Sequence, residues 1–449
     1  MNRSAVLFGL AAIVCSLSTV FGADLRLATF RADVTPAMGE PLIWVKPAKE
    51  VLDPLWAKGV VIDDGATRVV LCAVDWCGLG GSTHLLFREK IARAAGTDLA
   101  HVAVHSVHQH TAPYVVGDAN ALLARLPHPP LIMSRAFLER VTDRLAAEVK
   151  RATTRLRPFD RIGTGKARVD RVASARRIMV DGKLITRYSG GGSDPKLAAL
   201  PEGPIDPYLR TVTLAAGKRP LVQLHFYATH PQTFCCDGRV SGDIVNAARA
   251  AVEAGDGAFQ IYFTGCAGDV TVGKYNDGSV EARRQLAGRL RQGMETAIAA
   301  TRHAPVGELR WHTVPLRLPL ATEGPGAPQQ RRATLHTPEG RSGQELYRAA
   351  AGVAFAERKQ PLEADLLELG GVSILLLPGE PMLAFQRYAL ARRPDDFVVV
   401  AGYGDISPGY LCTDEAFRQG GYEPRASRAG PGTEARVRAA IDKLFGDAR

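Results

Sequence analysis

Three short segments of this chain each end an apolar run with an ionisable residue. They are Val-His-Gln-His at 107–110, Thr-His-Pro at 229–231 and Pro-Gly-Glu at 378–380. An apolar run that stops at His or Glu is typical of a buried strand that delivers a side chain to the edge of a sheet. Two histidines and a carboxylate, with room for water, are the donors of a catalytic zinc site. The sequence therefore predicts a metal site built from strand ends.

His108 and His110 have the spacing i, i+2, which places both side chains on the same side of an extended segment. One can bind a metal while the other orients substrate or transfers a proton. His105 is an odd number of residues from both, so we expect it to be structural. Taken alone, an H-x-H pattern is equally consistent with a chance pair.

His230 and Glu380 each have an alternative role. Pro231 ends the strand before it, and a lone histidine at a strand end is usually satisfied by a local hydrogen bond. Glu380 precedes Pro381, so its carboxylate can stabilise the N-terminus of the helix predicted there. That role is compatible with metal binding, because a carboxylate beside a helix start still binds a cation.

Other segments carry weaker signals. The turn at 265–271 is rich in glycine, so it can present N–H groups to an oxyanion, with Thr271 as a nucleophile or substrate contact; ordinary chain reversal is the alternative. Tyr410 and Tyr422 lie in a Gly-rich region, where packing is the default role. The adjacent cysteines Cys235 and Cys236 are either metal thiolates or, as we prefer, a disulfide or buried thiols.

Strand and helix patterns alternate along the chain. This alternation predicts an α/β fold with mixed β-sheets and packed helices. The segments 190–207 and 321–330 are predicted loops. Candidate ligands lie on both sides of the second loop, so we expect a single large catalytic domain. The predicted strands are 68–74, 101–104, 221–227, 259–264, 372–377 and 397–401, and the predicted helices are 82–96 (with Ser82 as N-cap), 137–149, 243–253, 280–300 and 381–393 (with Pro381 in its first turn).

Composition narrows the class of protein. The chain has 449 residues and a net charge of +10, but no dense Lys/Arg run interleaved with aromatics, so no nucleic-acid role is expected. A mildly basic surface is compatible with peripheral contact at anionic membranes. Residues 1–22, with Arg3 followed by an apolar core, have the pattern of a signal peptide. We therefore expect an exported protein, periplasmic or secreted, whose domain spans residues 23–449.

These motifs, in this order, resemble the catalytic domain of the neutral/alkaline ceramidase family. The family's serine in its Gly-Asp-Val-Ser turn is Thr271 here, and we expect no counterpart of its C-terminal immunoglobulin-like domain, so the chain resembles a divergent single-domain relative. The segments that carry the resemblance are Ala-Asp-Val-Thr at 32–35, the strand ending at Asp75, 107–113, His230-Pro231, Ser-Gly-Asp at 241–243, Gly-Asp-Val-Thr at 268–271, Pro-Gly-Glu at 378–380, Gly-Tyr-Leu-Cys-Thr at 409–413 and Tyr422-Glu423.

The resemblance implies an exported zinc-dependent amidohydrolase. Its reaction would be cleavage of an N-acyl, ceramide-like bond by zinc-activated water, and its substrate a small molecule or lipid. Arg176 is the best match to the family's active-site arginine. The resemblance implies zinc (Zn2+) bound by His108, His230, Glu380 and Tyr410, and His110, Tyr422, Arg176 and Thr271 as catalytic residues.

Two rival functions stay open. One is another metal-dependent hydrolase acting on esters, lactones or phosphate esters, for which Asp75, Asp243 and Asp269 could supply ligands to a second metal. The other is a non-catalytic binding protein on the same scaffold, with a closed structural zinc. Metal stoichiometry discriminates between the first rival and the amidase.

Overall fold

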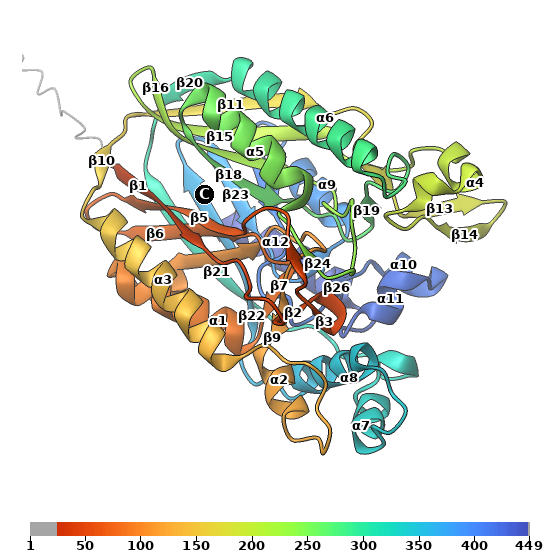
Figure 1. Cartoon of the computed structure of the whole chain (residues 1–449). Coiled ribbons are helices and arrows are strands. Elements are labelled where there is room, and N and C mark those ends of the chain that lie inside the picture. The colour runs from red at the N-terminus through yellow and green to blue at the C-terminus, as the bar shows by residue number, and fades with distance from the viewer. Residues whose placement is uncertain (1–24, 448–449) are drawn as a thin grey trace, which may run out of the picture.

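The computed structural model describes residues 25–447, in which three larger sheets surround a common core (Figure 1). The first sheet has the order β10-β1-β5-β6-β8, the second β18-β16-β15-β11-β20 and the third β21-β22-β23-β25. Their strands are β1 (Arg26–Asp33), β5 (Trp56–Asp63), β6 (Arg68–Val74), β8 (Val102–Ser106), β10 (Arg157–Pro158), β11 (Arg161–Arg168), β15 (Tyr208–Ala216), β16 (Arg219–Tyr227), β18 (Phe259–Thr264), β20 (Arg302–Pro305), β21 (Leu309–Leu316), β22 (Leu362–Leu369), β23 (Val372–Leu376) and β25 (Phe397–Ala401).

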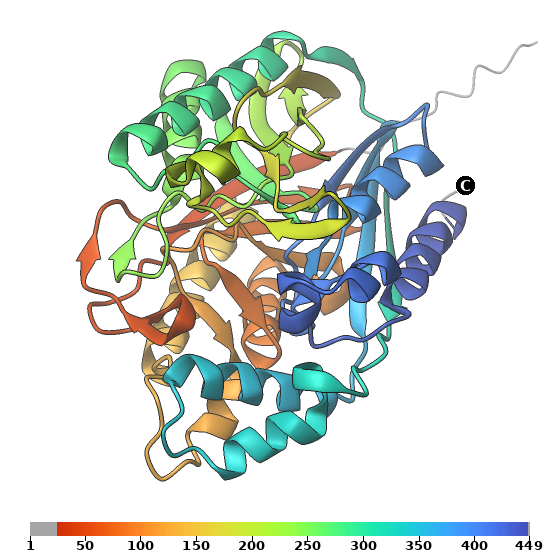
Figure 2. The ribbon, with the colours of Figure 1, turned by 90° about the vertical axis from the view of Figure 1, so that its right-hand side faces the viewer.

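Helix pairs cover the outer face of each sheet. The first sheet packs against α1 (Ser82–Ala95) and α3 (Arg135–Thr153), and the second against α5 (Asp243–Asp256) and α6 (Val280–Ala299). The third packs against α9 (Leu383–Arg392) and α12 (Thr433–Asp447), as Figure 2 shows. Apolar residues recur every three or four positions in α3, and Ser134 caps it by accepting a hydrogen bond from the Phe137 N–H.

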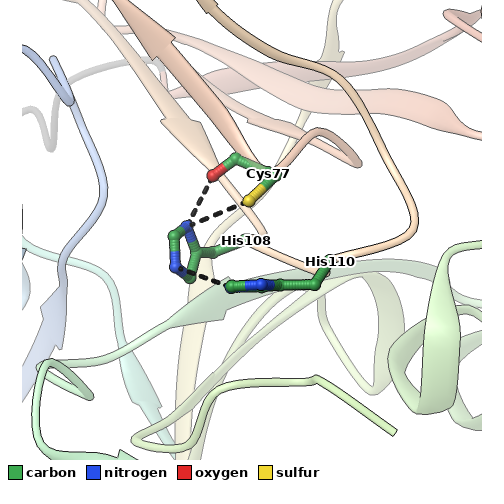
Figure 3. Close-up of side chains that lie close together, drawn as sticks. All are labelled: Cys77, His108 and His110. Atoms are coloured by element: carbon green, nitrogen blue, oxygen red, sulfur yellow. Dashed lines mark hydrogen bonds between the residues drawn. The ribbon is translucent and has the colours of Figure 1, made fainter. Parts of the chain in front are cut away.

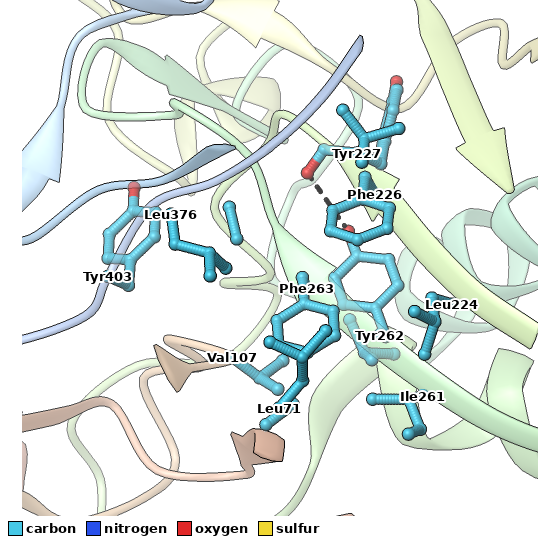
Figure 4. Close-up of a cluster of buried hydrophobic side chains, with 14 of the residues drawn as sticks. Leu71, Val107, Leu224, Phe226, Tyr227, Ile261, Tyr262, Phe263, Leu376 and Tyr403 are labelled. Atoms are coloured by element: carbon cyan, nitrogen blue, oxygen red, sulfur yellow. Dashed lines mark hydrogen bonds between the residues drawn. The ribbon is translucent and has the colours of Figure 1, made fainter. Parts of the chain in front are cut away.

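The inner faces of the three sheets share one hydrophobic core. Leu71, Leu224 and Leu376, one from each sheet, belong to it and are almost fully buried (Figure 4). Side chains alternate along each strand, so Val70, next to Leu71, faces the opposite way and packs in the cluster with α1 and α3. The sheets are therefore fixed relative to one another by burial of apolar surface.

Each sheet is mostly antiparallel but ends in one parallel pair: β6 with β8, β16 with β18, and β23 with β25. The carboxyl ends of parallel strands lie at the same edge of a sheet, where α/β proteins place their ligands. β8 leads to His108, β16 leads to His230 and β23 leads to Glu380. Strands β18 and β6, β18 and β8, and β16 and β25 adjoin, so these three edges meet.

Short elements complete the fold around this meeting point. Two two-stranded pairs, β12 with β19 and β24 with β26, carry predicted site residues. The remaining strands and α-helices are β2 (Pro41–Leu42), β3 (Lys46–Pro47), β4 (Glu50–Val51), β7 (Gly78–Gly80), β9 (Tyr114–Val116), β12 (Ser174–Ala175), β13 (Arg177–Val180), β14 (Lys183–Thr186), β17 (Arg239–Val240), β19 (Val270–Thr271), β24 (Glu380–Pro381), β26 (Tyr410–Leu411), α2 (Gly117–Leu123), α4 (Pro195–Ala199), α7 (Pro328–His336), α8 (Gly343–Ala356), α10 (Asp414–Gln419) and α11 (Tyr422–Ala426).

The structure confirms the α/β class with mixed sheets and corrects several local predictions. Ser82 is the first residue of α1 and Gly81 is its N-cap. Pro381 does not start α9; it pairs with Leu411 in β24, and the helix begins at Leu383. The predicted loops at 190–207 and 321–330 contain α4 and the start of α7, because Pro195 and Pro328 begin helices there. The predicted signal peptide at 1–22 lies outside the described residues.

Candidate metal centre

His108 follows β8 and is almost fully buried. Its φ of 74° places it in the left-handed region, which is uncommon for a residue with a side chain and costs about 1–3 kcal/mol. The segment 108–110 is therefore not extended, so the premise of the i, i+2 argument is wrong, although the two histidine side chains do lie together. The imidazole is held by its Nδ1, 2.5 Å from the Cys77 carbonyl oxygen (Figure 3).

His230 follows β16 and is fully buried. Its Nδ1 lies 2.7 Å from the Ala267 carbonyl oxygen and 2.9 Å from that of Val270. A neutral ring held in this way carries its proton on Nδ1 and leaves the Nε2 lone pair free. Burial, with Arg176 nearby, lowers the pKa of His230 to about 3, so the neutral form prevails.

Glu380 brings a carboxylate to these two rings. Its Oε2 lies 3.2 Å from Nε2 of His108 and 3.5 Å from Nε2 of His230, and no hydrogen-bond donor reaches that oxygen. Burial would raise the pKa of Glu380, but positive charge at the two imidazole nitrogens outweighs burial and holds it well below its usual range; a cation bound between neutral rings would supply that charge in their place. A cation between these three atoms would neutralise the buried carboxylate and engage the lone pairs of both rings. These donors fit a divalent metal that prefers nitrogen and oxygen, such as zinc.

His110 lies beside this cluster. Its Nε2 is 3.4 Å from Nε2 of His108, and the two rings meet edge to face, as the labelled pair in Figure 3 shows. On the other side of the ring, the Gln232 side-chain amide lies 2.9 Å from Nδ1. Burial, reinforced by His108 and His230, lowers the pKa of His110 well below its ordinary value. The structure thus places a neutral imidazole next to the donor cluster.

Tyr410 reaches the site through β24 and β26, where it is the direct register partner of Glu380. Its hydroxyl lies 3.0 Å from Nη1 of Arg176. Burial raises the pKa of Tyr410 above its usual range, whereas Arg176 acts in the opposite direction. A metal cation would act in the same direction as Arg176.

Arg176 follows β12 and links several predicted site residues. Its Nη2 lies 3.1 Å from Nε2 of His230, a contact that competes with a metal for the same lone pair. Burial would lower the pKa of Arg176, but Tyr410 and the fully buried Glu423 outweigh it, so the guanidinium stays charged. Its guanidinium carbon lies 5.6 Å from the centroid of the Tyr422 ring. Tyr422 is half-buried beside Tyr410.

Thr271 is fully buried in β19, which pairs with β12, and it forms an isolated bridge with His230. Its Oγ1 has no hydrogen-bond partner. Several other buried hydroxyls of the described chain also lack a partner, so it is the position of Thr271 beside His230, rather than its unpaired hydroxyl, that places it at the site. The structure therefore brings Thr271 next to a predicted metal ligand.

The sequence reasoning missed three residues of this site. Tyr403 stacks on His108 with ring centroids 4.2 Å apart, and its buried hydroxyl has no partner. Cys77 supplies the carbonyl that orients His108, and Gln232 contacts His110. The signal for Tyr403 was available, because it follows the predicted strand at 397–401 and stands between two glycines.

The preferred alternative for the adjacent cysteines is confirmed, since Cys235 and Cys236 form a disulfide. The acidic residues considered for a second metal have other partners. Asp75 pairs with Arg249, Asp243 accepts hydrogen bonds from Thr233, and Asp269 accepts one from the Leu383 N–H. In residues 25–447 none of these aspartates belongs to a cluster of three possible metal ligands.

Fold and site together define a class: an α/β protein in which three sheets deliver a His-His-Glu donor set to one buried point. No protein-family model matches the chain, and no curated protein matches it. Among solved structures, it is similar to a neutral ceramidase from Pseudomonas aeruginosa, with a TM-score of 0.71 and 17% identity over 94% of this chain and 74% of that chain. A ceramidase complexed with C2 gives a TM-score of 0.68 and 17% identity over 95% and 76%.

The chain therefore has the fold of the neutral ceramidases. The resemblance that its motifs suggested is confirmed at the level of the fold.

Proposed function

We propose that this chain is a zinc-dependent amidohydrolase that cleaves the N-acyl bond of a ceramide-like lipid. The observation that carries the proposal is the convergence of His108, His230 and Glu380, with Glu380 Oε2 left without a donor. The fold shared with ceramidases supports the substrate class. Fold alone does not set function, so the chemistry of the donor set has to carry the reaction type.

In this proposal His108, His230 and Glu380 hold the zinc, and Tyr410 is a fourth ligand. Zinc, when bound, supplies Lewis-acid chemistry that makes water nucleophilic at neutral pH and polarises a carbonyl. The carbonyls that fix Nδ1 of His108 and His230 set ring orientation and tautomer, as second-shell groups commonly do in zinc sites.

His110 is the proposed proton carrier to the leaving amine. It is held by Gln232, whose side chain presents either an N–H or an oxygen to Nδ1 after rotation of the amide. Gln232 can therefore match either tautomer of the ring as the proton moves. The lowered pKa keeps the imidazole neutral and ready to accept a proton, and the imidazolium formed by that step is the proposed donor to the leaving amine.

Arg176 and Tyr422 are the proposed donors to the oxyanion that develops on the amide carbonyl. Arg176 is charged, buried and fixed by Tyr410 and Glu423, so little reorganisation is needed during the reaction. Thr271 is proposed to contact the substrate through its unpaired hydroxyl.

We also propose that residues 1–22 are a signal peptide, that residues 23–449 are one domain, and that the mature protein is exported and touches membranes peripherally. No helix in the described part of the chain is long and apolar enough to cross a membrane. N-terminal sequencing of the protein from the periplasm of a bacterial host tests the cleavage, and a start at residue 1 would contradict it.

The decisive experiment measures zinc content and N-acylsphingosine hydrolysis in the same purified, non-reduced sample. We expect one zinc per chain and amide hydrolysis, both lost in H108A. H336A, which removes an exposed histidine in α7, is the matched control and should retain both. Zinc without hydrolysis of any N-acyl lipid would reject the substrate class, and two metals per chain would favour a phosphoesterase. Absence of zinc would reject the site.

A further inference from the structure

A disulfide between neighbouring residues lies directly beside the proposed proton carrier. Cys235 and Cys236 follow the His230-Pro231 segment by only a few residues, and neither cysteine is buried. The Cys235 sulfur lies 3.9 Å from Nδ1 of His110, and the Cys236 N–H donates to the His110 carbonyl oxygen at 3.4 Å. The proposed function does not use this disulfide.

These three residues form a potential ligand set of their own. One donor atom each from His110, Cys235 and Cys236 lies within 4.8 Å of the others. Sulfur in a disulfide is a poor ligand, whereas a thiolate is among the best for zinc and other soft cations. Imidazole with two thiolates is a donor set that zinc accepts, with a fourth position for water.

We propose that reduction of the Cys235–Cys236 disulfide creates a second, inhibitory site for a soft divalent cation, with Nδ1 of His110 and the two sulfurs as ligands. In the disulfide form the same sulfurs bind no metal. The second cation binds Nδ1 of His110, the ring nitrogen that the Gln232 side chain contacts in the structure. The inhibition, though not the binding, rests on the proposed function.

The reduction balances with a dithiol or phosphine reductant. The S–S bond takes up two electrons and two protons to give two thiols, while a dithiol closes its own disulfide or a phosphine takes oxygen from water to become a phosphine oxide. Binding of the cation then displaces the two thiol protons. Solvent access to the sulfurs allows both steps.

The free cysteines of the described chain are less suited to this chemistry, although Cys77 forms a possible ligand group with His108 and His110. Cys72, Cys77, Cys266 and Cys412 are buried, and burial raises the pKa of each thiol. Cys77 lies near His108, but its Sγ is 3.8 Å from the Nδ1 that the Cys77 carbonyl already holds. A C235S/C236S variant therefore keeps every other thiol as an internal control.

The test compares wild type and C235S/C236S, each untreated or reduced with a phosphine, which binds zinc weakly. After zinc loading and desalting, reduced wild type should carry one more zinc per chain than untreated wild type, and the variant should show no difference. With cobalt as the probe, sulfur-to-cobalt charge-transfer absorption should appear only in reduced wild type. Added zinc should slow hydrolysis by reduced wild type about 100-fold, the scale of a lost acid–base group.

Equal zinc content in reduced and untreated wild type would overturn the proposal, as would an extra zinc that the variant also acquires. The proposed function fails differently, because untreated protein would then hold no zinc or show no amide hydrolysis. C236S alone, checked by circular dichroism, replaces the double variant if that does not fold. It lacks one sulfur, so it should bind the extra zinc at least tenfold more weakly than reduced wild type.

Discussion

Two buried carboxylates follow strands of different sheets, and their surroundings are opposite. Asp75, after β6, accepts hydrogen bonds from Nη1 and Nη2 of Arg249 at 3.1 and 2.6 Å and from the Trp56 N–H at 2.9 Å. Glu380, after β23, faces two imidazole nitrogens, and its Oε2 has no donor. Both side chains are less than a tenth exposed.

The comparison separates a structural charge from a functional one. The sequence pattern is the same at both positions, an apolar strand that ends in an acidic residue. At Asp75 the fold supplies a complete set of donors, so the charge is neutralised within the protein. At Glu380 no donor contacts Oε2 and its nearest neighbours are two imidazole nitrogens, so a cation bound from outside would complete its partner set. Both carboxylates are buried. They differ in whether hydrogen-bond donors of the protein contact their oxygens.

The largest expected effect is in E380Q. The amide is nearly isosteric and can donate to Nε2 of His108, so the fold should be retained. A neutral amide is a much weaker ligand for zinc, and a Lewis acid contributes several kcal/mol to hydrolysis, so activity should fall by at least about 10³-fold. Elemental analysis should find less than a tenth of the wild-type zinc. If E380Q kept its zinc but had a lower free energy of unfolding, Glu380 would be a structural charge like Asp75.

The converse variant is D75N, which leaves the guanidinium of Arg249 buried without its counter-charge. Breaking a buried pair costs about 3–5 kcal/mol, and this should appear as a lower midpoint in urea unfolding. Zinc content per folded chain should not change. D170N, which breaks the exposed contact with Arg168, is the control and should leave the midpoint in place. Loss of zinc from folded D75N would show that Asp75 contributes to the metal site.

Asp365 in β22 is a third case, a buried carboxyl that stays mostly protonated below pH 7. Burial raises its pKa to about 7, although it accepts a hydrogen bond from the Thr313 hydroxyl at 2.7 Å. Because the folded pKa exceeds the unfolded value of 3.8, this group stabilises the fold fully below pH 3.8 and loses that stabilisation as pH rises to 7. About three pH units at ~1.4 kcal/mol each give a loss on the order of 4 kcal/mol.

D365N should therefore be more stable than wild type above pH 7. The difference between their free energies of unfolding should shrink as pH falls from 7 towards 4, and it isolates this group from the other carboxyls. Denaturant unfolding at several pH values measures it. A difference that does not vary with pH would mean that Asp365 is ionised in the folded protein, like Asp75.

Much of the site follows from local sequence. The predicted strands 68–74, 259–264 and 397–401 match their observed limits, and the apolar runs before His108, His230 and Glu380 identify these three residues. This succeeds because a buried strand must be apolar along its length, so a polar residue at its end is informative. The α/β class follows from the same alternation of patterns.

The rest depends on contacts between distant segments. The left-handed conformation of His108 is held by hydrogen bonds to residues of the β6–β7 connection, which no local pattern encodes. Arg176 reaches Tyr410 only because β12 pairs with β19 and β24 pairs with β26. Pairs of two residues have no periodicity to detect. Likewise, the local sequence around Asp75 resembles that around Glu380. The hydrogen-bond donors that distinguish the two residues come from other elements of the fold.

The smallest expected effect is in T271V. This variant asks whether a missing hydrogen-bond partner also marks a functional role for an uncharged side chain. Oγ1 of Thr271 is buried without a partner, so its replacement by a methyl group removes a desolvation cost and should raise the free energy of unfolding by about 1 kcal/mol. If the hydroxyl contacts substrate as proposed, kcat should fall about tenfold at unchanged zinc content, while T271S should keep most of the activity. A variant that is less stable than wild type would show that the hydroxyl already has a partner within the protein. An unchanged kcat would show that Thr271 is not a catalytic residue. The site would then be identified by Glu380 alone, whose Oε2 has no donor.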